Sequence, residues 1–504
     1  MLFNSYTFLV FFIIVLILHN LPFSWKTKKI NLLIASYVFY AAWNPPFILL
    51  LWLSTLVDFF VGRALYTQEN KYKKKLLLVI SLIGNLGMLC FFKYGGFILE
   101  NFTHLVNALG FDYHPAKPNI ILPAGISFYT FTTLCYTIDM YRKESKPVKT
   151  LLDFSLFVTF FPHLVAGPIV RPPQLVPQFE TPRKASRDQL LQGLFLLTLG
   201  LFMKVFLADG MLSGPANEVF GTADAVQTVD AWMGVLAFSG QIFFDFAGYS
   251  SCAIGAAMCL GFVLPQNFLF PYAAVGFTDF WRRWHITLSS WLRDYLYIPL
   301  GGNRKGTVRT YVNLMLTMLL GGLWHGANWT FVAWGALHGF YLWVEKAFRD
   351  ARRKSPEKSL LATSEVHKSS FAPSMKQRVE GEFPPETNHP KNLYNFFLAL
   401  CTFFLVNVTW VFFRSGTFGE AWRMLRSMFL HNTTGTPVLG YMDIIRVSVI
   451  TVILVIAHWL MRNTMVLKVA NKMPWWLLGI VWSLMIILIM LSQNASSSFI
   501  YFQF

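Results

Sequence analysis

Two histidines in aromatic, apolar sequence are the residues of this chain best suited to chemistry. His285 lies in DFWRRWHITLSSWLRDYLYIPLGGNRKG (279–306), and His325 lies in GGLWHGANWTFVAWGALHG (321–339). Removing a polar side chain from water without a partner costs on the order of 2–7 kcal/mol. His325 is therefore either hydrogen-bonded in a packed interior or placed in a reactive cavity. Ionisable residues inside membrane segments are functional candidates by default.

The surroundings of His325 favour a neutral base. Its sequence neighbours Trp324, Trp329 and Phe331 form an apolar setting, which disfavours the charged imidazolium. A neutral imidazole can take a proton from a hydroxyl group during nucleophilic attack. Asn328, one turn further on if this part is helical, would orient the ring or bind a developing oxyanion. For both His285 and His325 a purely structural hydrogen bond remains the alternative.

The composition indicates a membrane protein. Hydrophobic residues make up 55% of the 504 and charged residues 13%, whereas soluble domains carry about 25% charged residues. The net charge of +17 does not indicate nucleic-acid binding, because the basic residues cluster in short loops between apolar runs. The cysteines have no metal-type spacing, so we expect neither disulfides nor a metal site. They are Cys90, Cys135, Cys252, Cys259 and Cys401.

Apolar runs of spanning or near-spanning length follow one another along the chain and predict an all-α, polytopic helical bundle. The first run, 6–21, lacks a basic region before it and a cleavage site after it, so we interpret it as a retained helix. Runs 151–169 and 308–323 are short or broken by Gly and Pro. Irregular backbone at membrane depth requires surrounding protein or a water-filled cavity, so these runs predict re-entrant elements. The other runs are 31–43, 45–61, 76–98, 120–141, 189–208, 230–262, 326–348, 393–413, 442–461 and 474–493.

Basic loops set the predicted orientation. The loops around Lys28, Lys73, Lys146 and Arg304 would be cytoplasmic by the positive-inside rule, whereas 209–230 contains no Lys or Arg and would lie outside. Counting the membrane crossings between these loops places both termini outside. The polar loop 349–392 reads as a cytoplasmic linker. We expect one membrane domain, 1–504, that includes this loop and an aromatic tail at 496–504.

The stretch 279–298 has the pattern of an amphipathic, Trp-rich basic helix lying at the membrane interface. Its arginines either anchor the helix to lipid phosphate or form a positively charged entrance. Such an entrance would attract an anionic cytosolic donor, such as a nucleotide-bearing thioester. In the second case Arg282 and Arg283 would bind substrate.

Several patches in order along the chain carry a family resemblance. They are LGMLCFFKYGGF (86–97), LPAGISFYTFTTLCYTIDMYR (122–142), FVTFFPHLVAGPIVRP (157–172), the two histidine motifs and the terminal SSSFIYFQF. The chain resembles the membrane-bound O-acyltransferase (MBOAT) family, in its bacterial alginate O-acetyltransferase branch. The resemblance covers nearly all of the chain except 349–392.

The resemblance implies a helical bundle with re-entrant and interfacial helices around a central tunnel. His325 matches the family's catalytic histidine and His285 a second required one, with Trp324 and Asn328 beside the substrate. The tail matches a terminal Phe-x-Tyr-x-x-Phe motif at Phe499, Tyr501 and Phe504. Tyr501 would then carry the acyl group as an activated aryl ester, because a phenol is a suitable nucleophile once deprotonated. The alternative is an interfacial aromatic anchor.

The function implied is transfer of acetyl from a cytosolic thioester, acetyl-CoA, across the bacterial cytoplasmic (inner) membrane for O-acetylation of an extracytoplasmic polysaccharide. No cofactor would be bound. An exterior acetyltransferase or SGNH-hydrolase-like protein would complete the transfer, and the lipid bilayer is the other partner. One alternative is a D-alanyl transferase for teichoic acids, against which the built-in tail argues. The other is a polytopic transporter, against which the lack of an internal repeat argues.

Overall fold

The computed structural model describes residues 1–116, 118–353, 391–493 and 499–500. Within these ranges the regular elements are helices, apart from one isolated bridge between Val226 and Thr436. Six of the described helices are long and apolar enough to cross a membrane: Pro45–Thr67, Lys71–Ala108, Arg187–Gly221, Thr228–Cys259, Leu393–Arg414 and Tyr441–Met461. The prediction of an all-α, multi-pass membrane protein is therefore confirmed.

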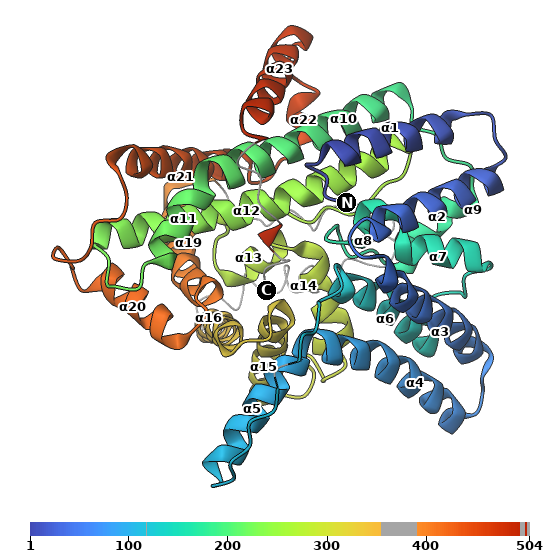
Figure 1. The fold of residues 1–504 in the computed structure, drawn as a ribbon, viewed down its shortest axis with the longest axis horizontal. Coiled ribbons are helices and arrows are strands. Elements are labelled where there is room, and N and C mark those ends of the chain that lie inside the picture. Colours follow the sequence, from blue (N-terminus) through green and yellow to red (C-terminus); the bar gives the residue numbers. More distant parts are fainter. Residues whose placement is uncertain (117, 354–390, 494–498, 501–504) are drawn as a thin grey trace.

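Most of the N-terminal helices lie together on one side of the molecule, whereas the helix of residues 95–108 projects away from them at the bottom of the view (Figure 1). They are α1 (Tyr6–Asn20), α2 (Trp25–Ala41), η1 (Pro45–Phe47), α3 (Ile48–Thr67), α4 (Lys71–Leu89), the π-helical η2 (Cys90–Tyr94), α5 (Gly95–Ala108) and α6 (Ile126–Arg142). Asp58 of α3 accepts hydrogen bonds from Asn85 of α4 at 2.7 Å and from Thr137 of α6 at 3.0 Å. This buried network holds α3, α4 and α6 in one arrangement, because an unpaired carboxylate there would be costly.

The run 151–169 folds as two short helices, α7 (Leu151–Thr159) and α8 (Phe161–Leu164), followed by α9 (Pro172–Glu180). The nine residues of α7 rise only about 14 Å, less than half of a bilayer core of about 30 Å. Nearly all side chains of α7 and α8 are buried by the rest of the chain. This short, covered element agrees with the predicted re-entrant character of the run.

Two long elements cross the middle of the molecule side by side. One consists of α10 (Arg187–Leu201), the π-helical η3 (Phe202–Leu212) and α11 (Ser213–Gly221), and the other is α12 (Thr228–Cys259). A Cβ on Gly200 would lie 2.5 Å from the carbonyl oxygen of Gly248, and a Cβ on Gly255 would lie 2.5 Å from that of Gly193. The paired glycines therefore let the two backbones meet directly, as small residues do between membrane helices.

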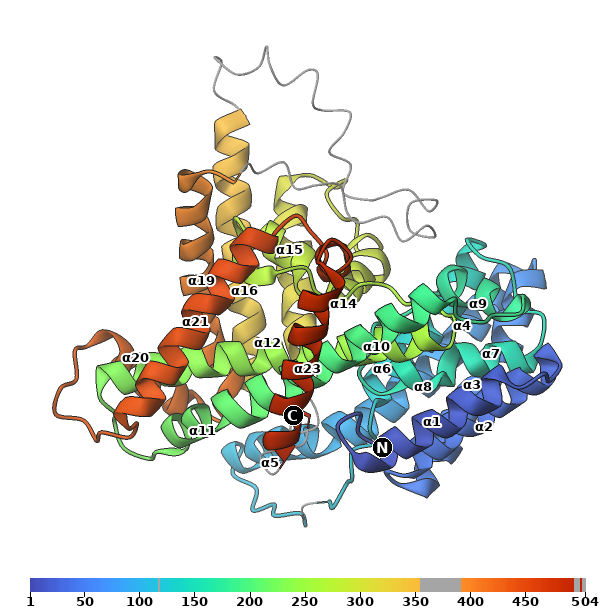
Figure 2. The same cartoon turned by 90° about the horizontal axis from the view of Figure 1, so that it is seen from above.

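The C-terminal half surrounds the centre of the molecule. Its elements are η4 (Pro271–Ala273), α13 (Phe277–Arg283), α14 (Ile286–Leu292), η5 (Arg293–Tyr297), α15 (Thr307–His325), α16 (Trp329–Arg353), α19 (Leu393–Arg414), α20 (Phe418–Phe429), α21 (Tyr441–Met461), α22 (Val466–Ala470) and α23 (Trp475–Leu491). Figure 2 shows α16 and α19 standing upright while α10 and α12 lie across the molecule. The α15–α16 hairpin is closely packed, since a Cβ on Gly335 would lie 2.3 Å from the carbonyl oxygen of Met318.

The predicted polar loop begins later than expected. Helix α16 continues to Arg353, so the first residues of 349–392 are helical. Residues 354–390 lie outside the described part of the chain, as do 494–498 and 501–504 of the predicted tail. The division into one domain with a cytoplasmic loop stays a prediction.

The expectation of one continuous helix over 279–298 is wrong, whereas its place at the membrane interface stays a prediction. The stretch breaks at His285 into α13 and α14 and ends in the π-helical η5. Phe280, Trp284 and Leu288 are each 1% exposed, so protein rather than lipid covers the apolar side. The periodicity identified the apolar face correctly, but it does not specify which molecule covers that face.

Candidate active site

The two histidines of the sequence motifs meet the same indole ring. The centroid of the His285 ring lies 6.0 Å from that of Trp324, and the centroid of the His325 ring lies 5.0 Å from it. The exposed fraction is 0% for His285 and 3% for His325. The fold thus places a histidine from the start of α14 and one from the end of α15 around one tryptophan in the interior.

A buried hydrogen-bond chain fixes the ring of His285. Its Nδ1 lies 3.0 Å from Oδ1 of Asn267, and the hydroxyl of Thr287 donates to the same oxygen at 2.9 Å. The amide nitrogen of Asn267 donates to Ser250 Oγ at 3.0 Å, which orients the amide group. An amide oxygen carries no proton and can only accept hydrogen bonds. The imidazole must therefore be the donor in its contact with Asn267, which assigns the proton to Nδ1.

The other ring nitrogen of His285 is left as a potential base. Nε2 is buried and has no hydrogen-bond partner among the described residues. Because the proton is on Nδ1, Nε2 carries a lone pair. Rings of Phe246 and Phe268 line this part of the site, with centroids 4.6 Å and 6.3 Å from that of His285. This arrangement can accept a proton from a hydroxyl brought to Nε2.

The backbone at His285 is in the left-handed region, with φ 43° and ψ 55°. Holding a residue other than glycine there costs on the order of 1–3 kcal/mol. The flanking backbone is held on both sides: Leu269 N donates to Arg283 O and Ile286 N donates to Asn267 O, each at 2.9 Å. The strained turn separates α13 from α14 and aims the imidazole at Trp324 rather than along a helix face.

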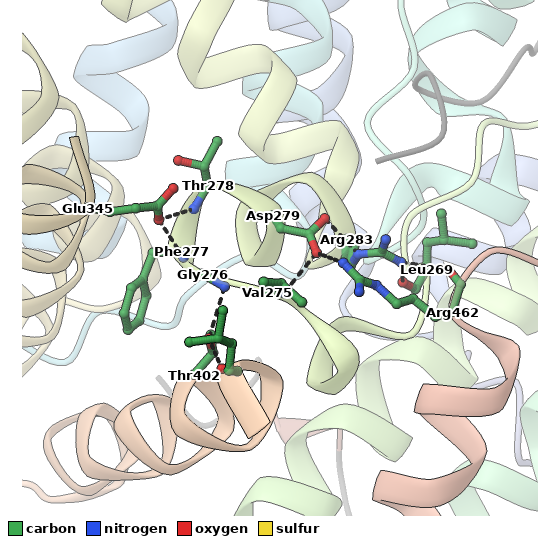
Figure 3. A network of polar contacts seen from close by, with 11 residues as sticks. Leu269, Val275, Gly276, Phe277, Thr278, Asp279, Arg283, Glu345, Thr402 and Arg462 are labelled. Carbon is green, nitrogen blue, oxygen red and sulfur yellow. Dashed lines mark hydrogen bonds and ion pairs between the residues drawn. The ribbon is translucent and has the colours of Figure 1, made fainter. Parts of the chain in front are cut away.

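A buried ion network anchors the helix before this turn (Figure 3). Asp279 accepts from Arg283 Nε at 2.8 Å and from Arg462 Nη2 at 2.5 Å, and Arg283 also donates to the carbonyl of Arg462 at 2.7 Å. Glu345 accepts from the backbone N–H groups of Phe277 at 2.7 Å and Thr278 at 2.9 Å, which caps the start of α13. These contacts fix α13, and through it His285, against α16 and the end of α21.

His325 is the last residue of α15, and two side chains of η2 complete that helix end. Lys93 Nζ donates to the carbonyls of Trp324 at 2.7 Å and His325 at 3.0 Å, and the hydroxyl of Tyr94 donates to Leu323 O at 2.9 Å. The last carbonyls of a helix lack intrahelical partners, and a cation is favourable at their negative end. Lys93 and Tyr94 therefore set where α15 stops and where its histidine projects.

The imidazole of His325 sits in an aromatic cage. Its centroid lies 5.0 Å from Trp334 and 5.3 Å from Phe413, in addition to Trp324. A Cβ on Gly326 would lie 2.1 Å from the Phe331 ring, so only glycine fits directly after the histidine. A cavity of about 50 Å³ borders Trp324 and Lys93 next to this cage. Its other lining residues are Trp43, Val165 and 122–128.

The remaining predicted site residues fall in different places. Arg282 is exposed on α13, whereas Arg283 is 3% exposed and paired with Asp279. Asn328 is not a helical turn beyond His325, because α15 ends there. It caps α16 by accepting from Thr330 N at 3.0 Å and donates to Gly416 O at 2.7 Å. Tyr501 lies outside the described residues.

Two residues near the histidines had no predicted role. Asn267 follows an apolar segment as an ordinary polar residue, and nothing in the sequence links it to His285. Lys93 was detectable, since it is the one charged residue in the apolar run 76–98. Charged residues inside such runs mark functional sites by default. Among the described residues no group of three or more His, Cys, Asp or Glu side chains is arranged to hold a metal ion.

Most of the chain is similar in sequence to known proteins. The model of the membrane-bound O-acyltransferase family matches residues 7–372. "Probable alginate O-acetylase AlgI" of Pseudomonas aeruginosa is 37% identical over 455 residues, which cover 90% of this chain and 80% of that protein. "Peptidoglycan O-acetyltransferase" of Helicobacter pylori is 38% identical over 431 residues, which cover 79% of this chain and 73% of that protein. "Teichoic acid D-alanyltransferase" of Streptococcus thermophilus is 30% identical over 240 residues, covering 44% and 57%.

The chain belongs to the membrane-bound O-acyltransferase family and is an O-acyltransferase. The predicted family is therefore confirmed, and the transporter alternative is set aside. An O-acyltransferase needs an acyl donor and a hydroxyl acceptor, and the buried histidines are the basic groups that the structure places together.

Asn267→Leu should lower turnover by about 10- to 100-fold, because the oxygen that holds His285 Nδ1 is removed. The KM for the thioester donor should stay unchanged, and Asn267→Asp should restore activity because a carboxylate also accepts from Nδ1. Thioester turnover by purified protein is the measurement. Gln266→Leu, at an exposed neighbouring position, is the matched control. Full turnover in Asn267→Leu would show that ring orientation by Asn267 does not matter.

Lys93→Met should destabilise the protein by about 1.5–3 kcal/mol and abolish activity, because carbonyls at the end of α15 lose their charged donor. Lys93→Arg should retain part of the stability and part of the activity, since a guanidinium also donates several hydrogen bonds. Thermal unfolding in detergent and thioester turnover report the two effects. Lys73→Met, at an exposed position on α4, should behave as wild type. Equal stability of Lys93→Met and wild type would contradict the capping role.

Proposed function

We propose that this protein moves an acetyl group from a cytosolic thioester, acetyl-CoA, across the bacterial cytoplasmic membrane for O-acetylation of a cell-envelope polysaccharide. The observation that carries the proposal is the pair of buried histidines around Trp324 in an O-acyltransferase. Two relatives named for different polymers, alginate and peptidoglycan, are 37% and 38% identical to the chain. The proposal is therefore made for cell-envelope glycans as a class.

In the proposed reaction His325 is the general base and Tyr501 the first acceptor. His325 takes the phenolic proton as the oxygen attacks the thioester carbonyl, and the carbon–sulfur bond breaks. The leaving thiolate receives that proton, so free thiol and an acetyl ester of tyrosine are formed. An acceptor hydroxyl then attacks the ester, and the phenolate recovers a proton. His285, whose Nε2 bears a lone pair, supplies a second base beside Trp324.

The described part of the tail, Phe499 and Ile500, supports this proposal. Phe499 and Ile500 are 1% and 3% exposed, so the chain enters the interior directly before Tyr501. The Phe499 ring lies 5.7 Å from Phe246, whose own ring lies 4.6 Å from His285. The described end of the tail is thus separated from His285 by the single ring of Phe246.

The proposed system needs a partner outside the membrane. An exterior acetyltransferase or SGNH-hydrolase-like protein would take the acetyl group to sugar hydroxyls. A teichoic acid D-alanyl transfer is less well supported, because the relative of that name matches only 44% of this chain.

His325→Ala should reduce polymer acetylation by about 10²- to 10⁴-fold, the usual contribution of a general base. The variant should insert into the membrane and accumulate normally, because Lys93 and Tyr94 hold the end of α15 through main-chain carbonyls that the substitution keeps. Acetyl content of the extracted polymer, normalised to protein in the membrane, is the measurement. His104→Ala, at an exposed position, is the matched control. Normal acetylation by a well-expressed His325→Ala would remove His325 from the mechanism.

Tyr501→Phe should abolish acetylation if the tail relays the acetyl group, because only the nucleophilic oxygen is removed. An aromatic anchor would lose almost no apolar area and would keep its function. Polymer acetylation should be measured together with mass spectrometry of the C-terminal peptide after incubation with acetyl donor. Tyr441→Phe, at a side chain 87% exposed, controls for the substitution. Near-normal acetylation in Tyr501→Phe would return the tail to the role of anchor.

A further inference from the structure

The C-terminal tail is attached to the interior by a backbone hydrogen bond. The N–H of Ile500 donates to Asp245 Oδ2 at 2.6 Å. The preceding Phe499 packs against α12, with its ring centroid 4.8 Å from that of Tyr249 and 5.7 Å from that of Phe246. A buried carboxylate therefore binds the main chain directly before the residue proposed to carry acetyl.

Asp245 is one of three buried charged residues. Lys204 Nζ lies 2.7 Å from Asp245 Oδ1 and 2.9 Å from Asp209 Oδ1, and the three side chains are 7%, 2% and 1% exposed for Lys204, Asp245 and Asp209. Lys204 and Asp209 belong to η3, which packs on α12. Two carboxylates and one ammonium are thus buried together in an apolar interior. Such a group requires further donors, and the N–H of Ile500 is one of them.

One face of α12 connects this dock to the histidine site. Asp245 and Tyr249 hold the tail, and Phe246 contacts both the tail and His285. Ser250 accepts from Asn267, which in turn orients His285. Residues at i, i+1, i+4 and i+5 lie on adjoining sides of a helix. The same two turns of α12 therefore position both the tail and the imidazole.

We propose that Asp245, held by Lys204, is a positioning residue that docks the C-terminal tail in register with His285. The dock uses the main chain of Ile500 and the ring of Phe499. Asp245 takes no part in bond making. That the docked tail presents an acetyl acceptor rests on the function proposed above, whereas the docking itself does not.

Hydrogen–deuterium exchange of the full-length protein in detergent tests the dock without reference to activity. Asp245→Asn should raise the exchange rate of the Ile500 amide by about tenfold or more, because a charged acceptor is replaced by a weaker neutral one. Asp230→Asn is the matched control, since Asp230 is also buried on α12 but accepts from Val438 N at 2.7 Å, away from the tail. Unchanged exchange at Ile500 in Asp245→Asn would overturn the proposal.

A tail variant covers the case in which Asp245→Asn fails to accumulate. Ile500→Pro removes the donating N–H and should raise exchange at Phe499 several-fold, whereas Ile500→Val should not. Exchange at Phe499 that equals wild type in Ile500→Pro would contradict the dock. Acetylation by the double variant Asp245→Asn/Ile500→Pro should equal that of whichever single variant acetylates less, because both changes break the same contact. A further loss in the double variant would mean that Asp245 acts other than through the tail.

The outcomes separate the dock from the relay. If Asp245→Asn releases the tail while Tyr501→Phe acetylates normally, the dock stands and the relay fails. If the tail stays protected in Asp245→Asn, the dock fails whatever Tyr501→Phe does.

Discussion

The end of α15 in the interior is the constraint on which the site depends. A helix that stops inside an apolar bundle exposes its last carbonyl groups, and each of them needs a donor where no water is at hand. The protein supplies Lys93 and Tyr94 from η2, which bind the carbonyls of Leu323, Trp324 and His325. The π-helical winding of η2 is a local departure of the kind often found at functional sites. Because α15 ends there, its final two side chains, an indole and an imidazole, project into the centre.

Buried side chains also need hydrogen-bond partners, and this requirement fixes the ring of His285. Each polar atom of the chain from Ser250 through Asn267 to His285 Nδ1 and Thr287 has a partner, so the network has one low-energy arrangement. That arrangement offsets the cost of the left-handed backbone at His285 and determines which ring nitrogen carries the proton. The aromatic rings around both histidines supply shape and exclude water, whereas the polar contacts supply orientation.

The sequence predicted what depends on residue type and order along the chain. The apolar runs and basic loops predicted a multi-pass helical protein, and the family resemblance implied a catalytic role for both His285 and His325. It did not predict the break between α13 and α14, because a 3.6-residue periodicity continues across a single left-handed residue. It left lipid anchoring and substrate binding open for Arg283 and did not predict the ion pair with Asp279, which lies one turn away on the same helix. Asn267 and Asp245 were not predicted, since their partners are distant in sequence and only the fold brings them together.

The placement of tail and histidine on one helix has a physical rationale. Group transfer requires reacting atoms within about 3–3.5 Å of each other, and a displacement of about 1 Å can cost 10²-fold in rate. Positional error accumulates with each contact that separates two groups. The tail is one hydrogen bond from α12 at Asp245, and His285 is two hydrogen bonds from α12 through Asn267 and Ser250. Because α12 is largely buried and packs through glycines directly on α10, it is a rigid reference for both. Phe499 and Ile500 can thereby be held as accurately as side chains of the core.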